Sequence, residues 1–532
     1  MLPEVIRFVL LAGLISWALL WVSRSGRKKP TDRTGPGLPE ARGREPDKPA
    51  TRTFGKAGPR PAPAAQPDHA AEFRRMAEDR DNAHKARLRA HVERAVPPIT
   101  ESGREAIERA RREWLAIRHV FPPRLPQRSM SYFGGLPIVP DEFDWPTVHN
   151  RKGLLERLNF VAQIDCSTVP PGHCRDLLPD KGYLYFFAPL ADSFGADARH
   201  FVCRYEQGPV RKDWSPLDMP FTGTVQSDDP VEAAWRGKRT HFDRVEIELG
   251  WLAEPTDEEV AARGEEGYPF EVAETIRREK LDAFFGPRHE PVPAPPAGAA
   301  PREGLQIPYE GFPTNWMEVR ILERLALAYH REETTDVAER LEKMSPVPDD
   351  HPEAIRLSAL KSDLSSFSAK IRRAFFNDAR LKDHETVPEE RRREVRAFLE
   401  DLRADGMPSS KERRYLHRRL PLVIDSWMSA AALRGGEAAL LDKDSAPLVA
   451  PEVMAELARR HSARNHRMLG AGELVQTAAE DMKDRYLLLL QLAPDAALGW
   501  TVGEMGPLQY WITPEDLAAR RFENTVLTIE AY

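Results

Sequence analysis

The chain contains little cysteine and no excess of positive charge. Three cysteines among 532 residues cannot form a disulfide framework, and their small number suits a reducing compartment. The formal net charge of −6 argues against a nucleic-acid-binding protein, because such proteins normally carry a basic domain. The mean hydropathy of −0.52 excludes a polytopic membrane protein. We therefore expect a globular protein with no nucleic-acid partner.

The chain also lacks the strong catalytic motifs. It has no Gly-x4-Gly-Lys-Ser/Thr phosphate loop, no Gly-x-Ser-x-Gly elbow and no His-Glu-x-x-His pair. This absence weakens an enzyme interpretation without eliminating it. Cys166, His173, Cys174 and Cys203 have ligand chemistry but lack the usual Cys-x2-4-Cys spacing, so we interpret them as ordinary buried or loop residues. We expect no cofactor and no metal.

One long hydrophobic run is present, at the N-terminus. Residues 5–22 are apolar apart from Arg7 and Ser16, and at about 1.5 Å per residue they span roughly 27 Å, enough for a bilayer core. The near-neutral start favours a retained anchor over a cleaved signal peptide. Basic residues follow at Arg24, Arg27, Lys28, Lys29 and Arg33. By the positive-inside rule, the sequence predicts a transmembrane anchor at 1–23 in the cell inner membrane, single-pass, with the C-terminal domain cytoplasmic.

The segments after the anchor change in composition. Residues 24–68 are rich in Pro, Gly and charge, which predicts a disordered tether. Residues 69–98 have helix-forming composition with sparse apolar residues, and we interpret them as a polar helical stalk. A firmer helix is expected from Ser102, which has capping-box spacing to Glu105. Its predicted apolar face is formed by Ile107, Ala110, Trp114 and Ile117.

The remaining pattern is that of an α+β domain with a mixed sheet. The Gly- and Pro-rich segment 131–140 predicts an ordered loop, whereas 160–165 and 182–187 have the composition of strands. Residues 486–492 and 506–512 repeat this arrangement, with a Gln near the end of the first strand and Gly-x-Leu-x-aromatic-aromatic in the second. The repeat suggests an internal duplication. Thr513-Pro-Glu-Asp516 predicts a capped helix, and 525–532 a closing strand.

These residues carry a resemblance to a known family. Tyr-Phe-Gly-Gly-Leu-Pro (132–137), Trp-Pro (145–146), Phe-Val-Ala-Gln-Ile-Asp (160–165), Gly-Tyr-Leu-Tyr-Phe-Phe (182–187), His-Arg-Met-Leu-Gly (466–470) and the segment 512–524 resemble the YwqG-like family, the domain of unknown function 1963. The resemblance covers roughly 100–205 and 465–532. It implies an α+β fold and brings no established activity. Glu504 departs from the family's pattern, which tends to have Asp in Gly-Asp-x-Gly.

The resemblance divides the rest of the chain. We expect a first part of the YwqG-like domain at 99–311, a helical insertion at 312–464 and a second part at 465–532. Apolar residues recur at helical spacing from Asn315 to about Arg460. The arginines of this segment stand beside acids, which favours a solvated, salt-bridged face over an anion-binding surface.

Candidate site residues come from both ends of the domain. Asp165, Glu504 and His466 would form an acid–base cluster if the two ends pair in one sheet, and Asp144 could join them. Capping and loop roles are the competing interpretation, which we favour, and we assign no catalytic residue. For ligand binding, the candidates are Asp144 with Trp145 and Trp500 as an aromatic wall, although core positions are commoner for tryptophan.

Three functions remain open at this point. The preferred one is a membrane-anchored binding or interaction module for an unknown protein or small-molecule ligand. The first alternative is a hydrolase-type enzyme that uses Asp165, Glu504 and His466, and the second is a structural membrane-associated scaffold. An enzyme requires convergence of those side chains in a concave pocket, and a binding module requires an apolar groove or patch.

Overall fold

A computed structural model describes most of the chain from residue 98 onward. The described ranges are 98–150, 155–190, 199–200, 202–208, 210, 241–263, 269–286, 311–344, 351–375, 380–405, 408, 413–461, 465–473, 482–495, 497–500 and 506–529. The expected anchor (1–23), the tether (24–68) and stalk residues 69–97 lie outside them, as does Glu504. Within these ranges, no helix is both long and apolar enough to cross a membrane.

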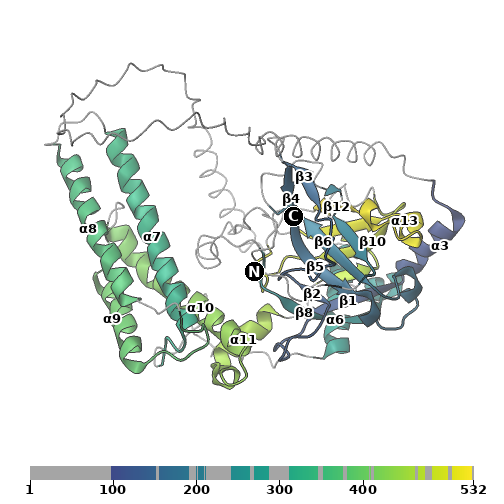
Figure 1. Ribbon diagram of the computed structural model, residues 1–532, viewed down its shortest axis with the longest axis horizontal. Coiled ribbons are helices and arrows are strands. Elements are labelled where there is room, and N and C mark those ends of the chain that lie inside the picture. The colour runs from purple at the N-terminus through teal and green to yellow at the C-terminus, as the bar shows by residue number, and fades with distance from the viewer. Residues whose placement is uncertain are drawn as a thin grey trace, which may run out of the picture. The chain divides into compact units, whose positions relative to one another are not determined.

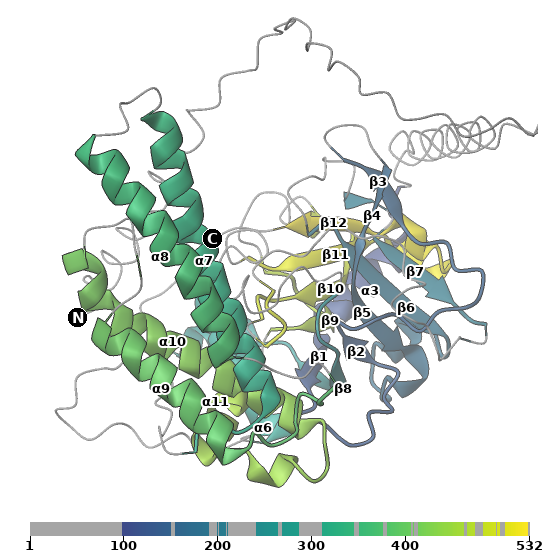
Figure 2. The ribbon, with the colours of Figure 1, turned by 60° about the vertical axis from the view of Figure 1, so that its left-hand side comes forward.

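The described strands form one large antiparallel sheet. Its ten strands follow the order β12-β11-β10-β9-β1-β8-β2-β5-β6-β7, and Figure 2 shows β12 to β9 on one side of β1 and β8, with β5 and β6 on the other. A separate ribbon pairs β3 with β4. The α+β class is confirmed, but the expected mixed sheet is wrong, because each pairing among the described strands is antiparallel. The strand bounds are β1 Glu113–His119, β2 Tyr132–Phe133, β3 Thr147–His149, β4 Leu155–Arg157, β5 Asn159–Asp165, β6 Tyr183–Ala188, β7 Cys203–Glu206, β8 Val245–Ala253, β9 Arg467–Leu469, β10 Leu487–Leu492, β11 Leu508–Ile512 and β12 Val526–Ile529.

The helix expected from Ser102 is shorter than predicted. Helix α3 spans Glu101–Ala110, and its N-cap is Thr100, whose hydroxyl accepts a hydrogen bond from the Gly103 amide. Trp114 and Ile117 therefore belong to β1 and not to a helical face. The reason is that β1 is a central strand, paired with β8 on one side and β9 on the other and buried on both faces. Burial on both faces removes the alternation that normally marks a strand.

The Gly- and Pro-rich segment 131–140 also differs from expectation. Tyr132 and Phe133 form the two-residue strand β2, which pairs with β5 on one side and β8 on the other. Gly134 and Gly135 then adopt positive φ angles of 62° and 66° and end the strand. A side chain at Gly134 would collide with the backbone carbonyl of Asp243, so glycine is needed at this close approach.

The sheet curls so that its two ends share one core. The Phe186 ring of β6 meets the Tyr510 ring of β11 edge-on at 5.1 Å between centroids. The Tyr510 hydroxyl also donates to the Phe187 carbonyl at 3.1 Å. Because β6 and β11 lie near opposite ends of the strand order, these contacts join the first and last parts of the chain into one hydrophobic cluster.

The described helices fall into two groups. Helices α3, α5 (Asp257–Ala262), α6 (Pro269–Phe285) and α13 (Pro514–Ala518) accompany the sheet, and the predicted cap of α13 is confirmed, since Thr513 accepts from the Asp516 amide. Helices α7 (Trp316–Lys343), α8 (Pro352–Ala374), α9 (Glu389–Asp405), α10 (Arg413–Leu440) and α11 (Pro451–Arg460) have a hydrophobic core of their own. Figure 1 shows α7, α8, α9 and α10 of this second group running alongside one another. Arg434 of α10 reaches back to Asp243 at 2.6 Å.

The two halves of the sheet contain the same hydrogen-bond pattern. In the first half, the buried side chain of Gln163 accepts from the Ile138 amide at 2.9 Å. In the second half, the buried side chain of Gln491 accepts from the Glu473 amide at 3.0 Å. In each half, the amide that donates to the Gln side chain lies the same number of residues after two consecutive residues with positive φ angles. That pair is Gly134-Gly135 in the first half and Leu469-Gly470, with φ of 57° and 76°, in the second.

The correspondence extends to the residue before each short strand. The Asp165 amide donates to the Ser131 hydroxyl at 2.9 Å, and the Ala493 amide donates to Nδ1 of His466 at 3.2 Å. The Ser131 and His466 carbonyls accept from the amides of Ile247 and Ile117 in the neighbouring strand. His466 therefore occupies in the second half the place that Ser131 occupies in the first.

Candidate functional site

Three buried polar side chains meet at the edge of the sheet where β1 ends. His119 is the last residue of β1, His466 immediately precedes β9, and Asp495 follows β10. Antiparallel pairing of β9 with both β1 and β10 brings these three points together. Nε2 of His466 lies 2.9 Å from Oδ2 of Asp495, and Nε2 of His119 lies 3.1 Å from the same oxygen. Each residue is no more than 2% exposed. We call these residues the His–Asp cluster.

The carboxyl group of Asp495 is held in its ionised form. Its Oδ1 accepts hydrogen bonds from the backbone amides of Ala497 at 2.8 Å and Leu498 at 3.3 Å, while Oδ2 faces the two imidazoles. Burial by itself would raise the pKa of Asp495, but the facing His119 and His466 side chains outweigh it and hold the pKa well below its usual range. Asp495 is thus a buried carboxylate in its ionised form.

By donor type, His119, His466 and Asp495 could hold a transition metal, because their ligand atoms lie within 4.8 Å of one another. A metal-bound histidine normally donates a hydrogen bond from its second ring nitrogen. Here the second nitrogen of His466 accepts one from the Ala493 amide, so neutral His466 carries its proton on Nε2 and donates it to Asp495. The same amide contact recurs at Ser131 in the other half. The geometry therefore fits a hydrogen-bonded cluster better than a metal centre.

A third histidine connects the cluster to the helical segment. Nδ1 of His461, at the C-terminal end of α11, lies 3.0 Å from Nδ1 of His119, so one ring donates and the other accepts. The His461 ring also stacks on Phe121 with 4.6 Å between centroids. His119 therefore lies between Asp495 and His461, with one ring nitrogen facing each of them.

Aromatic rings enclose the cluster. Phe133 lies 5.0 Å from the ring of His466 and 5.4 Å from Trp500, measured between centroids. Trp500 also packs edge-on against Phe242 at 5.5 Å. Trp500 is 3% exposed, and no described residue accepts a hydrogen bond from its indole nitrogen. None of the described cavities is lined by the three cluster residues, so the cluster suits structure or proton transfer better than direct contact with a substrate.

The structure brings together some of the residues singled out from the sequence and separates others. His466 and Trp500 lie side by side, with 6.2 Å between ring centroids. Asp165 lies at the opposite edge of the sheet, because β5 runs antiparallel to β1, and its carboxylate caps the following turn through Ser167. The expected convergence of Asp165 with His466 therefore does not occur. Glu504, the third member of that candidate set, lies outside the described residues.

Asp144 and Trp145, the other two candidates for ligand binding, lie apart from the His–Asp cluster in the first part of the domain. Asp144 is exposed, whereas Trp145 is 6% exposed and donates its indole N–H to the Leu158 carbonyl at 2.9 Å. Trp145 also packs edge-on against Phe187, so it belongs to the core. Asp495, His119 and His461 are site residues that the sequence motifs do not single out. The available signal was the position of Asp495 just after the predicted strand 486–492, next to the segment that contains His466.

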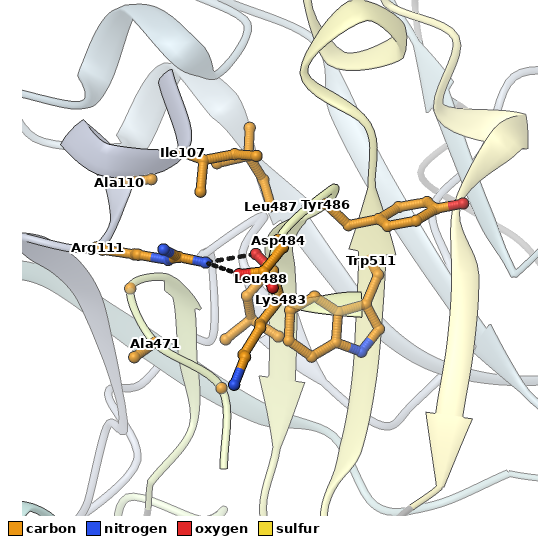
Figure 3. Close-up of a pocket in the computed structure, with 12 residues that line it drawn as sticks. Ile107, Ala110, Arg111, Ala471, Lys483, Asp484, Tyr486, Leu487, Leu488 and Trp511 are labelled. Atoms are coloured by element: carbon orange, nitrogen blue, oxygen red, sulfur yellow. Dashed lines mark hydrogen bonds and ion pairs between the residues drawn. The ribbon is translucent and has the colours of Figure 1, made fainter. Parts of the chain in front are cut away.

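A cavity of about 290 Å³ opens at the edge of the sheet where β1 begins. Figure 3 shows Arg111 from the end of α3 pointing toward the segment that leads into β10. Its guanidinium donates to the Lys483 carbonyl at 2.5 Å and lies 3.4 Å from the Asp484 carboxylate. The Gly470-Ala471-Gly472 turn, which follows β9, forms another wall. The apolar lining consists of Ile107, Ala110, Leu487, Leu488 and Trp511. We call this space the α3 cavity.

A second cavity, of about 300 Å³, occupies the corresponding place in the first half of the sheet. It is lined by residues 135–138, which follow the left-handed Gly134-Gly135 pair, and by residues 241–244, which precede β8. Its wall is more polar, because it includes His241, Asp243 and Arg244. The Arg244 guanidinium stacks on the Tyr132 ring at 3.9 Å, and Asp243 pairs with Arg434. The α3 cavity therefore offers the more apolar lining of the two.

Comparison with protein families finds one matching description, Domain of unknown function (DUF1963), over residues 131–280 and 327–530. These ranges cover well over half of the chain. They include His466, Asp495 and the Gly470–Gly472 turn, and they include most of the helical segment. His119 and α3 precede the matched region. No curated protein matches the chain.

Proposed function

The chain belongs to the DUF1963 family, and on that premise we propose that it is a recognition module that binds a small ligand, or a short segment of a partner protein, in the α3 cavity. The observation that carries this proposal is the lining of that cavity. An apolar floor provides contact area, and the ionised groups of Arg111, Lys483 and Asp484 stand at its rim. Ligand sites combine these two features, with hydrophobic contact for affinity and a few polar groups for orientation.

The side chains around the α3 cavity favour binding over chemistry. Its twelve lining residues contribute no histidine, cysteine, serine or threonine, and the Asp484 carboxylate is paired with Arg111 at 3.4 Å. The Trp511 indole lies directly under the turn, because a side chain added at Gly472 would come within 2.7 Å of its ring. A planar or branched apolar group is the ligand moiety that this floor suits.

A cavity-filling substitution tests the proposal. In the full chain, Ala471→Phe places a benzyl group in the α3 cavity and is expected to abolish binding of aromatic and branched aliphatic fragments. Ligand-observed NMR with a fragment library provides the measurement. The matched control is Ala262→Phe at the exposed end of α5, which should leave every hit unchanged. If the hits of the natural chain persist in Ala471→Phe, or if the natural chain binds no fragment, the proposal is wrong.

The hydrolase alternative has less support. Of its candidate residues, His466 has a carboxylate partner, but that partner is Asp495 and the pair is enclosed. A catalytic cluster must reach a substrate, and no described cavity is lined by the three residues of the His–Asp cluster. We therefore keep this alternative second to recognition. The scaffold alternative predicts no fragment binding at either cavity, so the NMR experiment separates it from our proposal.

We also propose that the two halves of the sheet arose by internal duplication, with the helical segment 312–464 inserted between them. The supporting observation is the shared hydrogen-bond pattern around Gln163 and Gln491, which includes the left-handed turns and the residue before each short strand. The strand order supports it as well. On one side of the central pair β1 and β8, the strands follow in the order β2, β5, β6 and β7, and on the other side they follow in the order β9, β10, β11 and β12.

The membrane anchor remains a proposal based on the apolar run 5–22 and the basic residues that follow. We expect the full chain to pellet with inner membranes and to resist extraction by high salt or alkaline carbonate. A chain that lacks residues 1–23 should remain in the supernatant. Recovery of the intact chain in the soluble fraction would contradict an anchor, and a reporter fused to the C-terminus should be active only in its cytoplasmic form.

A further inference from the structure

The helical segment contains a cavity of its own, of about 250 Å³. It lies between the start of α7, the C-terminal part of α10 and the segment that leads into α11. The wall is mainly aliphatic, with Ala432, Ala439, Leu448, Val449, Ala450 and Val453. Because drug-sized ligands usually occupy more than about 300 Å³, a cavity of this size suits a small metabolite. We call it the α7–α10 cavity.

A glutamate, an arginine and a histidine line this aliphatic space. Glu318, in the first turn of α7, is 4% exposed, and its carboxyl group accepts hydrogen bonds from the amide and the hydroxyl of Thr314. Among the described residues no lysine or arginine donates to it, so its charge is not neutralised by a direct ion pair. Arg392 of α9 also lines the cavity, where its Nε donates to the Val387 carbonyl at 2.8 Å and its Nη1 lies 3.6 Å from the Glu389 carboxylate.

The backbone of α10 makes room for this carboxyl group. Asn315, the N-cap of α7, donates to the Gly435 carbonyl at 3.1 Å and so holds the start of α7 against α10. A side chain at Gly435 would come 2.4 Å from Cγ of Glu318. Glycine within a helix lowers helix stability. The close approach of Glu318 to α10 therefore depends on a residue that the helix itself disfavours.

The charges around Glu318 agree with an unfilled cation site. Burial raises the pKa of Glu318 to about 7, against the opposing effects of its hydrogen bonds to Thr314 and Asn315 and of the positive charge of Arg392. His384, which also lines the cavity, lies 3.6 Å from Asp442. A bound ammonium group would supply the positive charge that the carboxylate lacks.

We propose that the α7–α10 cavity binds a small aliphatic α-amino acid. Its ammonium group would meet the Glu318 carboxylate, its carboxylate would meet the Arg392 guanidinium, and its side chain would lie against Leu448, Val449 and Val453. A zwitterion offers one charged group to Glu318 and one to Arg392, whereas a simple amine or a simple carboxylate can engage only one of these two side chains. This site is separate from the α3 cavity, so its failure would leave the proposed recognition function intact.

Calorimetric titration of the full chain with L-valine and L-leucine tests the proposal. We expect saturable binding of at least one of them, with at least tenfold weaker binding of isobutylamine and isovalerate, each of which lacks one charged group. Near pH 7 binding should also release about half a proton, because the ammonium group displaces the proton from a carboxyl group with a pKa of about 7. Titrations in two buffers with different ionisation enthalpies measure that release.

Variants assign the site. Glu318→Gln and Arg392→Gln should each weaken amino-acid binding at least tenfold, whereas Glu332→Gln, on the exposed face of the same helix α7, should not change it. Ala450→Leu fills the cavity without altering a charge and should also abolish binding. Ala359→Leu, at an exposed position of α8, is its control. Binding that survives Glu318→Gln and Ala450→Leu, or no binding of either amino acid at millimolar concentration, would overturn the proposal.

Discussion

Replacement of Asp495 by alanine is expected to lower the free energy of unfolding by about 3 to 5 kcal/mol, the cost of breaking a buried, hydrogen-bonded charge cluster. The substitution removes the acceptor of the Ala497 and Leu498 amides and of the His466 imidazole, and the carboxylate that the His119 ring faces at 3.1 Å. Urea unfolding followed by circular dichroism measures the loss. Asp495→Asn should cost nearly as much, because its amide N–H groups would face the Nε2–H of His466.

The control is an exposed aspartate in an ion pair. Asp176 pairs with Arg109 at 2.8 Å, but its side chain is 63% exposed, so Asp176→Ala should cost less than about 1 kcal/mol. A loss below 1 kcal/mol for Asp495→Ala would contradict the cluster as described. A chelator should not destabilise the natural chain, because the tautomer of His466 favours a hydrogen bond over a metal. If chelation does destabilise it and zinc reverses the effect, the cluster is a metal centre.

The stability that Asp495 provides should depend on pH in a defined direction. Its pKa is lowered in the folded state, so the unfolded chain takes up the proton first as the pH falls. The contribution is therefore present above the unfolded pKa of about 3.9 and is lost below it. The difference in stability between the natural chain and Asp495→Ala should accordingly shrink under strong acid.

The contribution of Glu318 to stability is expected to depend on pH in the opposite direction to that of Asp495. Glu318→Gln should therefore stabilise the chain at alkaline pH. Burial raises the pKa of Glu318 from 4.5 to about 7, so folding favours the protonated acid. Its favourable contribution is complete below pH 4.5 and is lost as the pH rises through 7. Between pH 5 and pH 8 the natural chain should lose about 2 to 3 kcal/mol relative to the Gln variant.

The Gln side chain suits this test because it keeps the shape and hydrogen-bonding capacity of the protonated acid. Its carbonyl can accept from the Thr314 amide while its NH2 group donates to the Thr314 hydroxyl. Urea titrations at pH 5, 6.5 and 8 give the three points needed, with Glu332→Gln as the exposed control on the same helix. Equal stabilities of the natural and Gln chains at all three pH values would show that Glu318 is not desolvated in the folded chain.

Local sequence patterns were sufficient for much of the sheet. Strands β5, β6, β10 and β11 are runs of apolar and aromatic residues between turns, and the structure has them close to the predicted positions. The helix α13 followed from a capping threonine and a first-turn proline. In these segments, local propensity and tertiary burial favour the same conformation.

Strand β1 was the main local error, and its cause is general. Ile107, Ala110, Trp114 and Ile117 are spaced like one face of a helix, yet the chain leaves the helix at Ala110. A strand buried on both faces shows no alternation, so its sequence does not distinguish it from a buried helix. Only its pairing with β8 and β9, from distant parts of the chain, fixes it as a strand.

The candidate site also depends on strand pairings between distant parts of the chain, which local sequence motifs do not reveal. His466 and Asp165 come from the two ends of the domain, and the sequence predicts that they meet if these ends pair in one sheet. In the structure, equivalent positions of the two halves lie at opposite edges of the sheet. The reason is that the central strands β1 and β8 are antiparallel, so corresponding strands on either side of them also run in opposite directions. Asp495 and His119 join His466 through strand pairings that no local pattern reveals.

The pairing of β1 with β9 also has a consequence for synthesis on the ribosome. Ala116 and its partner Arg467 are about 350 residues apart, and bacterial translation at about 5 to 20 residues per second needs roughly 20 to 70 s to cover that interval. Throughout this time the β9-facing edge of β1 has no strand to pair with, and open edges are prone to intermolecular association. A nascent chain of this protein is therefore a candidate for chaperone protection until its last 70 residues emerge.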